Sequence, residues 1–411
     1  FLSGSLVSLL LAASSVTSHA IPSTTPSQLL IRDDGGGINS NTSQACTNCT
    51  NLGNFNDPLP VYDSDPTVKV LNGTYAGIRL DSVDANDTFS GIGVKSPQDL
   101  FLGIPYAQQP SGERRFKRPE RLGDDHSWQE TRSAKRYSEH CYSVGTDNNY
   151  LPPYVTYKLG EECLTLNVVR PANVTESDKL PVWVWIHGGG FVSVHSSLCP
   201  CLSADHIFCS LQNYGGSGDT RYNASWIVDD AVQTGNPFIF ASLNYRTGLL
   251  GFPLGDEANS TGVFNLGLYD QRLALNWIKE NIASFGGDPE KVTIIGESAG
   301  GASMFFHLSA YGGRDDHLFR GVLSESGYWA TTPIEANTTA IQNTAWSAFL
   351  NATSCLSGDT QAHFDCLRSL PSEQVKTAIN STDVAKGNWN PTVDGDIVQK
   401  DLQRSFLDGD F

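Results

Sequence analysis

Basic residues are scarce in this sequence. Only 27 Lys and Arg stand against 44 Asp and Glu in 411 residues, which gives a formal net charge of −17. A chain with this charge repels phosphate backbones and anionic membrane surfaces. We therefore expect no nucleic-acid partner.

Apolar runs long enough to span a bilayer are also lacking. The stretch "LVSLLLAASSV" (6–16) is apolar but too short to cross a membrane, and the small residues Ser18 and Ala20 follow it. This pattern predicts a secretory leader over residues 1–20, cleaved after Ala20 and truncated at its start. A hydrophobic N-terminal strand is the alternative interpretation.

Glycosylation sequons support secretion. Ten N-x-S/T sequons occur in the chain, at Asn41, Asn48, Asn72, Asn86, Asn173, Asn223, Asn259, Asn337, Asn351 and Asn380. Together with a leader they predict a secreted, extracellular glycoprotein. Because that compartment is oxidising, cysteines are interpreted first as disulfide partners.

The remaining chain divides into two parts. Residues 21–60 are rich in Ser, Thr, Asn, Asp and Gly, which predicts a flexible N-terminal segment. Residues 61–411 alternate apolar runs with helical stretches and form one predicted domain. The segment 21–60 contains Cys46 and Cys49, for which the first interpretation is a local disulfide. A zinc half-site is the alternative, but no second half-site lies nearby.

Three apolar runs predict buried strands, at 181–187, 237–245 and 291–298. Between the last two runs lies a helical apolar face formed by Leu273, Leu275, Trp277, Ile278 and Ile282, with glycines at 286 and 287 to end it. Strand, helix and strand in this order predict a mostly parallel, doubly wound α/β sheet.

The stretch "VTIIGESAGG" contains a G-x-S-x-G motif between a strand and a helix. That context is the one a nucleophile elbow requires, because a sharp turn must expose the hydroxyl of Ser298. Glycines two residues to either side allow neighbouring backbone to pass closely. A chance match in a loop is the alternative interpretation.

A second glycine-rich stretch, "WIHGGGF", follows the first predicted strand. Acyl transfer needs backbone N–H groups that stabilise a developing oxyanion, and glycines let backbone approach that closely. No Lys-Ser/Thr pair follows these glycines, which argues against a phosphate-binding loop. We expect no cofactor and no metal.

At this point the sequence resembles the type-B carboxylesterase/lipase family, which includes cholinesterases and fungal extracellular lipases. The resemblance runs from about Thr74 to the end and is carried by "GIPYAQQPSGERRFKRP", "EECLTLNV", "HGGGF", "LNYRTGLLGF", "NLGLYDQRLALNWIKENIASFGGDPEKVTIIGESAGG" and "LFRGVLSESG". It implies the α/β-hydrolase fold and hydrolysis of carboxylic esters, of small molecules or lipids, through an acyl-enzyme.

The resemblance also implies roles for individual residues. Ser298 resembles the family's nucleophile. The residues that resemble its oxyanion-hole donors are Gly189, Gly190 and Ala299. Glu297 resembles a glutamate of the pocket, and Ser326 resembles a serine that helps to position the triad acid. Two disulfides are implied, Cys141–Cys163 and Cys355–Cys366.

A serine nucleophile needs a histidine base and an orienting acid, which follow the serine in α/β-hydrolases. Only three histidines follow Ser298. His307 is expected to lie on the helix after the G-x-S-x-G motif and to be a packing residue. His317 lies in a charged turn, and His363 is expected to be solvent-exposed within the second disulfide loop. The domain is therefore expected to be incomplete at its C-terminus, with the acid and the base beyond Phe411, and this polypeptide to be inactive or nearly so.

The substrate class is less determined. No Trp occurs between residues 141 and 163, where cholinesterases have a choline-stacking tryptophan, and that loop is short and polar. This disfavours cholinesterase activity and leans toward an esterase rather than a triacylglycerol or sterol-ester lipase. A non-catalytic adhesion or binding module on the same fold is the competing hypothesis. The sequence leaves the oligomeric state open.

Residues 192–212 interrupt the resemblance. Without them the chain reads "HGGGFNYGGSGDTRYNASWIV", which is close to the family pattern. The 21-residue length and the encodable splice signals at its ends favour a retained intron. A lid, an additional disulfide and a metal site from its histidines and cysteines are the alternatives.

Overall fold

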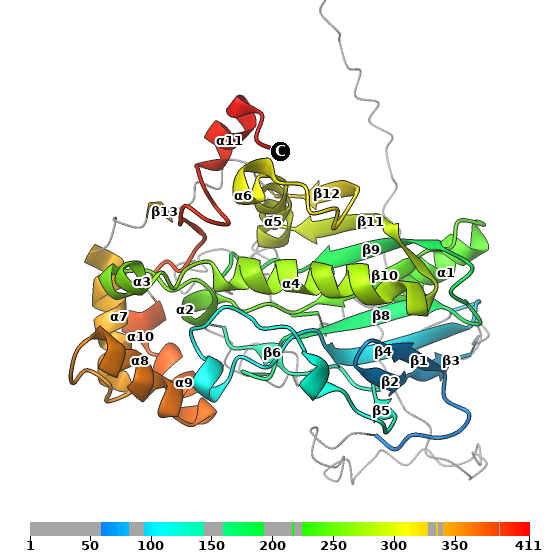
Figure 1. Ribbon diagram of the computed structural model, residues 1–411, viewed down its shortest axis with the longest axis horizontal. Coiled ribbons are helices and arrows are strands. Elements are labelled where there is room, and N and C mark those ends of the chain that lie inside the picture. Colours follow the sequence, from blue (N-terminus) through cyan, green and yellow to red (C-terminus); the bar gives the residue numbers. More distant parts are fainter. Residues whose placement is uncertain are drawn as a thin grey trace, which may run out of the picture.

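The computed structural model describes residues 59–81, 94–143, 159–192, 216–217, 224–327, 334–335, 340–385 and 387–411 (Figure 1). The predicted leader, nearly all of the predicted N-terminal segment and nearly all of the 192–212 insert lie outside these residues. Their predictions are therefore not tested by the structure.

A seven-stranded sheet forms the centre of the molecule (Figure 1). In spatial order its strands are β12 (Gly321–Glu325), β11 (Gly287–Glu297), β9 (Leu180–Ile186), β10 (Ile239–Leu243), β8 (Thr165–Pro171), β4 (Gln98–Pro105) and β3 (Ile78–Leu80). The pairs from β12 to β10 are parallel, whereas β10–β8, β8–β4 and β4–β3 are antiparallel. The three predicted strands are β9, β10 and β11, which make up the parallel half together with β12; the sheet as a whole is mixed, with three parallel and three antiparallel pairs.

Side chains of these strands contribute to two hydrophobic cores on opposite faces of the sheet. Along β9, Val182, Val184 and Ile186 belong to the larger hydrophobic cluster, while Trp183 and Trp185 pack against the smaller one. This alternation is the two-residue period of a strand. Apolar residues on both faces explain why the sequence pattern of β9 is nearly continuous.

The predicted central helix is α4 (Leu266–Asn281), and a 3₁₀ turn (Ile282–Phe285) continues it to Gly286, whose φ is +88°. Leu275, Trp277 and Ile278 are buried in the larger core, as the apolar face predicts. The other helices are α1 (Ser225–Gln233), α2 (Gly248–Gly251), α3 (Asp256–Thr261), α5 (Ala299–Leu308), α6 (Ala310–Gly313), α7 (Ala340–Ala352), α8 (Thr360–Ser369), α9 (Ser372–Ile379), α10 (Thr382–Ala385) and α11 (Leu402–Asp408).

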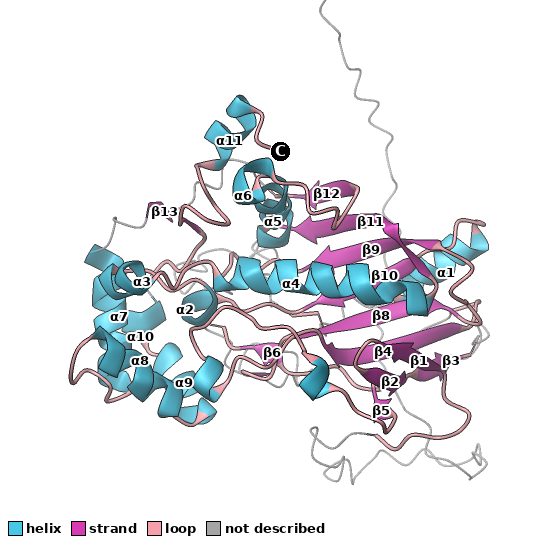
Figure 2. Ribbon diagram, in the orientation of Figure 1, coloured by secondary structure: helices cyan, strands magenta, loops and turns pink. Residues whose placement is uncertain are grey.

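Helices α7 to α10 gather on the side of the sheet toward which β9 and β11 point (Figure 2). Two-residue and four-residue strands complete the described secondary structure. They are β1 (Thr67–Val70), β2 (Gly73–Ala76), β5 (Arg132–Ser133), β6 (His140–Cys141), β7 (Leu159–Gly160), β13 (Ile334–Glu335) and β14 (Thr392–Val393).

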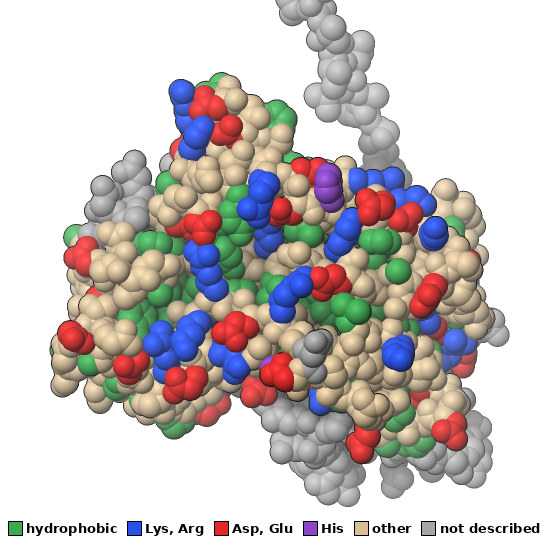
Figure 3. Space-filling view, in the orientation of Figure 1, with side chains coloured by type: hydrophobic (Ala, Val, Ile, Leu, Met, Phe, Trp, Pro, Cys, Tyr) green, Lys and Arg blue, Asp and Glu red, His purple; other side chains and the backbone are tan. Residues whose placement is uncertain are grey.

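Two disulfides link segments around this frame. Cys141 is bonded to Cys163, and Cys355 is bonded to Cys366, which are the pairings that the family resemblance implies. On the face shown in Figure 3, acidic and basic side chains are interspersed rather than gathered into a basic patch. No helix within the described ranges is sufficiently long and apolar to cross a bilayer.

Candidate active site

Ser298 lies at the turn between β11 and α5. Its backbone angles are φ 55° and ψ −119°, which a non-glycine residue adopts only under strain. The Ser298 N–H donates to the Glu325 carbonyl at the end of β12, over 2.9 Å. The turn is therefore tied to the neighbouring strand, and the serine side chain is held at the carboxyl end of the sheet.

The flanking glycines are explained by close backbone contacts. A Cβ on Gly296 would overlap the backbone of Gly300, and a Cβ on Gly300 would overlap the carbonyl of Ile186 at the end of β9. A side chain at either position would force the turn apart. The G-x-S-x-G spacing is thus a packing requirement of this strand–turn–helix junction.

The glycine-rich stretch His187–Phe191, which we call the oxyanion loop after the role that the sequence predicts for it, lies directly against Ser298. A Cβ on Gly188 would be 3.1 Å from the Ser298 Cβ and 2.8 Å from the Glu297 carbonyl. Gly189 and Gly190 have φ values of +109° and +59°, a backbone region that favours glycine. The structure thus brings together two glycine motifs that are more than 100 residues apart.

Ala299 is the first residue of α5, a helix of 10 residues. The first N–H groups of a helix have no partner within it, and the helix dipole favours negative charge at this end. The Ala299 N–H is therefore suited to an oxyanion. Its role, like those of Gly189 and Gly190, stays a prediction.

Two further predicted residues flank the turn. Glu297 ends β11 opposite Glu325 of β12, and its Oε2 would be 2.9 Å from a Cβ on Gly188. Ser326, with φ +50°, directly follows the residue whose carbonyl accepts the Ser298 N–H. Both residues therefore border the nucleophile turn.

His307 lies on α5 and is completely buried. Its Nε2 is 2.9 Å from the Gln271 Oε1 of α4. Burial, reinforced by the charge of Arg272, lowers the pKa of His307 from 6.5 to about 3. A neutral imidazole between two helices is a packing group, as the sequence predicts.

The other two histidines differ from each other. His317 is exposed and lies 2.9 Å from the Asp315 carboxylate. The expectation that His363 is solvent-exposed is wrong, because only 8% of it is accessible. Its Nδ1 lies 3.0 Å from the Glu257 carboxylate of α3, and its Nε2 lies 3.1 Å from the Leu356 carbonyl. The Cys355–Cys366 loop folds α8 onto α3 and buries the ring.

Within the part of the chain that the structure describes, no hydrogen bond joins the Ser298 hydroxyl to a histidine. No cluster of metal-ligating side chains occurs in those ranges either. The described site consists of a serine, backbone N–H groups and glycines.

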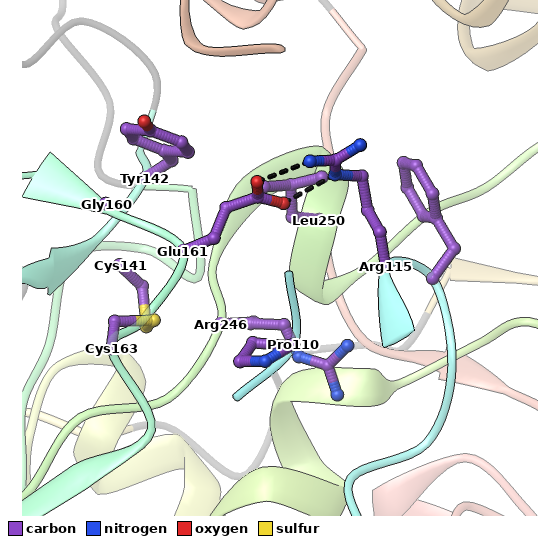
Figure 4. A pocket seen from close by; sticks show the side chains of 10 residues that line it. Pro110, Arg115, Cys141, Tyr142, Gly160, Glu161, Cys163, Arg246 and Leu250 are labelled. Atoms are coloured by element: carbon purple, nitrogen blue, oxygen red, sulfur yellow. Dashed lines mark hydrogen bonds and ion pairs between the residues drawn. A yellow bond between two sulfur atoms is a disulfide. The ribbon is translucent and has the colours of Figure 1, made fainter. Parts of the chain in front are cut away.

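A small pocket lies beside the Cys141–Cys163 disulfide (Figure 4). Across it the buried Arg115 binds Glu161 through two hydrogen bonds of 2.6 Å, and its guanidinium also donates to the carbonyls of Leu367 and Leu370. Because every group here has a protein partner and Ser298 does not line the pocket, this feature ties the disulfide loop to the α8–α9 junction rather than forming the reactive centre.

Sequence reasoning assigned no role to Tyr245, which contacts the oxyanion loop. The Tyr245 hydroxyl donates to the His187 carbonyl over 2.9 Å, and the two rings are stacked with centroids 4.3 Å apart. The available signal was a tyrosine at the end of the predicted strand 237–245, two residues after β10 ends, in "LNYRTG". That signal does not reveal which loop the tyrosine contacts.

Residues 64–408 match the model of the carboxylesterase family. This chain belongs to that family. Among its curated relatives, Lipase 1 of Geotrichum candidum is 34% identical over 79% of this chain and 59% of the lipase. A secreted triacylglycerol lipase of Gibberella zeae is 34% identical over 77% of this chain and 49% of that protein.

The solved structure of EstA from Aspergillus niger superposes on this carboxylesterase-family chain with a TM-score of 0.63, at 29% identity. The match covers 84% of this chain and 58% of EstA. The α/β-hydrolase fold implied by the resemblance is thereby confirmed. The chain spans about three fifths of the length of the first curated relatives that it matches.

Proposed function

We propose that this chain provides the nucleophile and oxyanion hole of a secreted serine hydrolase that cleaves carboxylic esters. The observation that carries the proposal is the strained Ser298 turn with the oxyanion loop packed directly against it. Several relatives are named as secreted lipases, which supports extracellular ester hydrolysis as the activity.

In the proposed reaction, the Ser298 oxygen attacks the ester carbonyl carbon and a C–O bond forms. The carbonyl π electrons move to oxygen, where the N–H groups of Gly189, Gly190 and Ala299 stabilise the negative charge. Collapse breaks the bond to the alcohol, which leaves with a proton, and an acyl-serine remains. Water then hydrolyses this ester, and Ser298 regains its proton.

We propose that the base that accepts the serine proton is not among the described histidines, because none of them is hydrogen-bonded to the Ser298 hydroxyl. The partners of His307, His317 and His363 are Gln271, Asp315 and Glu257 respectively. We therefore propose that the described residues alone do not sustain turnover, because the hydroxyl is not activated.

A fluorophosphonate probe tests the nucleophile. Its phosphorus forms a P–O bond to Ser298, the P–F bond breaks, fluoride leaves and the serine proton passes to solvent or buffer. We expect one slow adduct on the peptide that contains Ser298, no adduct in Ser298→Ala, and faster labelling when imidazole is added as an external base. Intact-protein and peptide mass spectrometry provide the readout.

The possible outcomes separate the hypotheses. An unlabelled Ser298, with or without imidazole, favours a non-catalytic binding module on this fold. Turnover of p-nitrophenyl esters that disappears in Ser298→Ala would show that the base is present after all. Esters of graded acyl length distinguish esterase from lipase activity once an active form of the protein is in hand. The relatives that are named as lipases favour lipase activity.

A further inference from the structure

The oxyanion loop needs an external support. Gly189 and Gly190 have positive φ values and no side chains, so these residues are conformationally permissive. Donors that stabilise a transition state must nevertheless be held within fractions of an ångström of their productive position. Within the loop, the Val192 N–H donates to the Gly189 carbonyl over 3.1 Å and the His187 Nδ1 lies 2.9 Å from the Gly188 carbonyl. Contacts at the two ends of the loop attach it to the rest of the protein.

Tyr245 supplies the contact at the first end. Its hydroxyl donates to the His187 carbonyl over 2.9 Å, and the two rings stack at an interplanar angle of 16°. Both residues are at most 1% exposed. Because a peptide group is planar with its C=O and N–H opposed, fixing the His187 oxygen also fixes the direction of the Gly188 N–H and the start of the glycine run.

Gly248, three residues after Tyr245, supplies the contact at the second end. Its N–H donates to the Phe191 carbonyl over 2.7 Å. The Phe191 ring packs edge-on against Phe252, with centroids 5.2 Å apart, and against Phe306 of α5. One short segment, Tyr245–Gly248, thus contacts both ends of the oxyanion loop.

That segment is itself anchored to α4. The Arg246 guanidinium donates to both carboxylate oxygens of Asp270, over 2.8 and 2.7 Å, and the Arg246 backbone N–H donates to Asp270 as well. Both side chains are at most 4% exposed. A buried, bidentate ion pair is strongly directional, so it fixes Tyr245 relative to the helix.

We propose that Tyr245 is the positioning residue of the oxyanion loop. It touches no reacting atom; it sets the orientation of the His187–Gly188 peptide and thereby of the donors that follow. This inference rests on the proposed function for its catalytic consequence, whereas its geometric content concerns the loop alone.

Tyr245→Phe tests the inference, because it keeps the ring and removes only the hydroxyl. Losing one buried hydrogen bond leaves the chain folded. We expect hydrogen exchange at residues 188–191 to accelerate about three- to tenfold. We also expect the first-order rate constant of fluorophosphonate labelling to fall by roughly tenfold with unchanged probe affinity, less than the hundredfold or more that loss of a donor costs.

Tyr106→Phe is the matched control. The Tyr106 hydroxyl, also buried, donates to the backbone carbonyl of Asn244 over 2.7 Å, next to Tyr245 but not on the oxyanion loop. We expect a similar change in melting temperature and no change in loop exchange or labelling rate.

The two readouts fail independently. Unchanged exchange at 188–191 in Tyr245→Phe would overturn the proposed support, and so would an unchanged labelling rate constant. If Tyr106→Phe changed loop exchange and labelling as much as Tyr245→Phe, Tyr245 would be a general packing residue and the proposal would also be overturned. A wild-type chain that is never labelled defeats the proposed function, and the exchange measurement then still decides the role of Tyr245.

Discussion

At the scale of single residues, burial determines what each titratable group can do. His307 and His363 both follow Ser298 in sequence, and both are removed from solvent by packing between helices. His307 hydrogen-bonds through one ring nitrogen, and its Nδ1 is buried without a partner. A ring held in this way stabilises the fold only while it is neutral.

The sign of the resulting pH dependence follows from the pKa values. The folded pKa of His307, about 3, lies below the ordinary value of 6.5, so the unfolded chain binds the proton first. The stabilisation is complete above pH 6.5 and is lost as the pH falls toward 3. We expect His307→Gln to remove up to about 1.4 kcal/mol per pH unit of this slope between those limits.

Denaturant unfolding at a series of pH values measures that slope. The same change at the exposed His317 is the matched control for the substitution itself. Parallel curves for the wild type and His307→Gln would contradict the lowered pKa.

At the scale of secondary structure elements, the site depends on how closely β9, β11 and α5 approach one another. Gly296 and Gly300 face backbone atoms at that junction, with no room for a methyl group. The strain at Ser298 persists because both flanking elements are held by the sheet and by the larger core. The reactive turn is therefore a property of three packed elements.

Gly300→Ala should be severely destabilising, by about 3 kcal/mol or more, because its methyl group meets the Ile186 carbonyl and backbone cannot move aside cheaply. Gly321→Ala in β12 is the control, since its methyl group would be in ordinary contact with Thr293, at 3.6 Å or more. Thermal unfolding of both variants provides the comparison. Equal melting temperatures would contradict the packing explanation of the motif.

At the scale of the whole molecule, the folded surface divides the described sequons into two groups. Asn173, Asn259 and Asn351 are exposed. The Asn72 amide instead lies 3.2 Å from the Gly123 carbonyl, and the Asn380 Oδ1 is buried. Because a glycan is bonded to Nδ2, a glycan on Asn72 would have to break the contact with the Gly123 carbonyl.

On secretion, we therefore expect glycans at Asn173, Asn259 and Asn351 and a largely unmodified Asn72. Peptide mapping after enzymatic deglycosylation in heavy-oxygen water identifies the occupied sites, with Asn259→Gln as the control that loses one of them. Full occupancy at Asn72 would contradict the structural argument, and a chain without any glycan would contradict the proposed secretion.

The sequence by itself determined the features that arise from local pattern. Apolar runs predicted β9, β10 and β11, and the apolar face predicted α4. The flanks of the G-x-S-x-G motif predicted a strand–turn–helix at Ser298, because the apolar run before the motif and the helix-forming stretch after it are local features of the sequence. The antiparallel strands β8 and β4 were not predicted, since polar residues such as Asn167 in β8 and Gln98 and Asp99 in β4 interrupt their apolar runs.

Only the tertiary structure decided how distant segments meet. It buried His363 against Glu257, placed Gly188 beside Ser298, and brought Tyr245 to the oxyanion loop. Each of these contacts joins residues that are 58 or more positions apart, as with Tyr245 and His187. Such contacts depend on the whole packed core, and a local pattern carries no information about them.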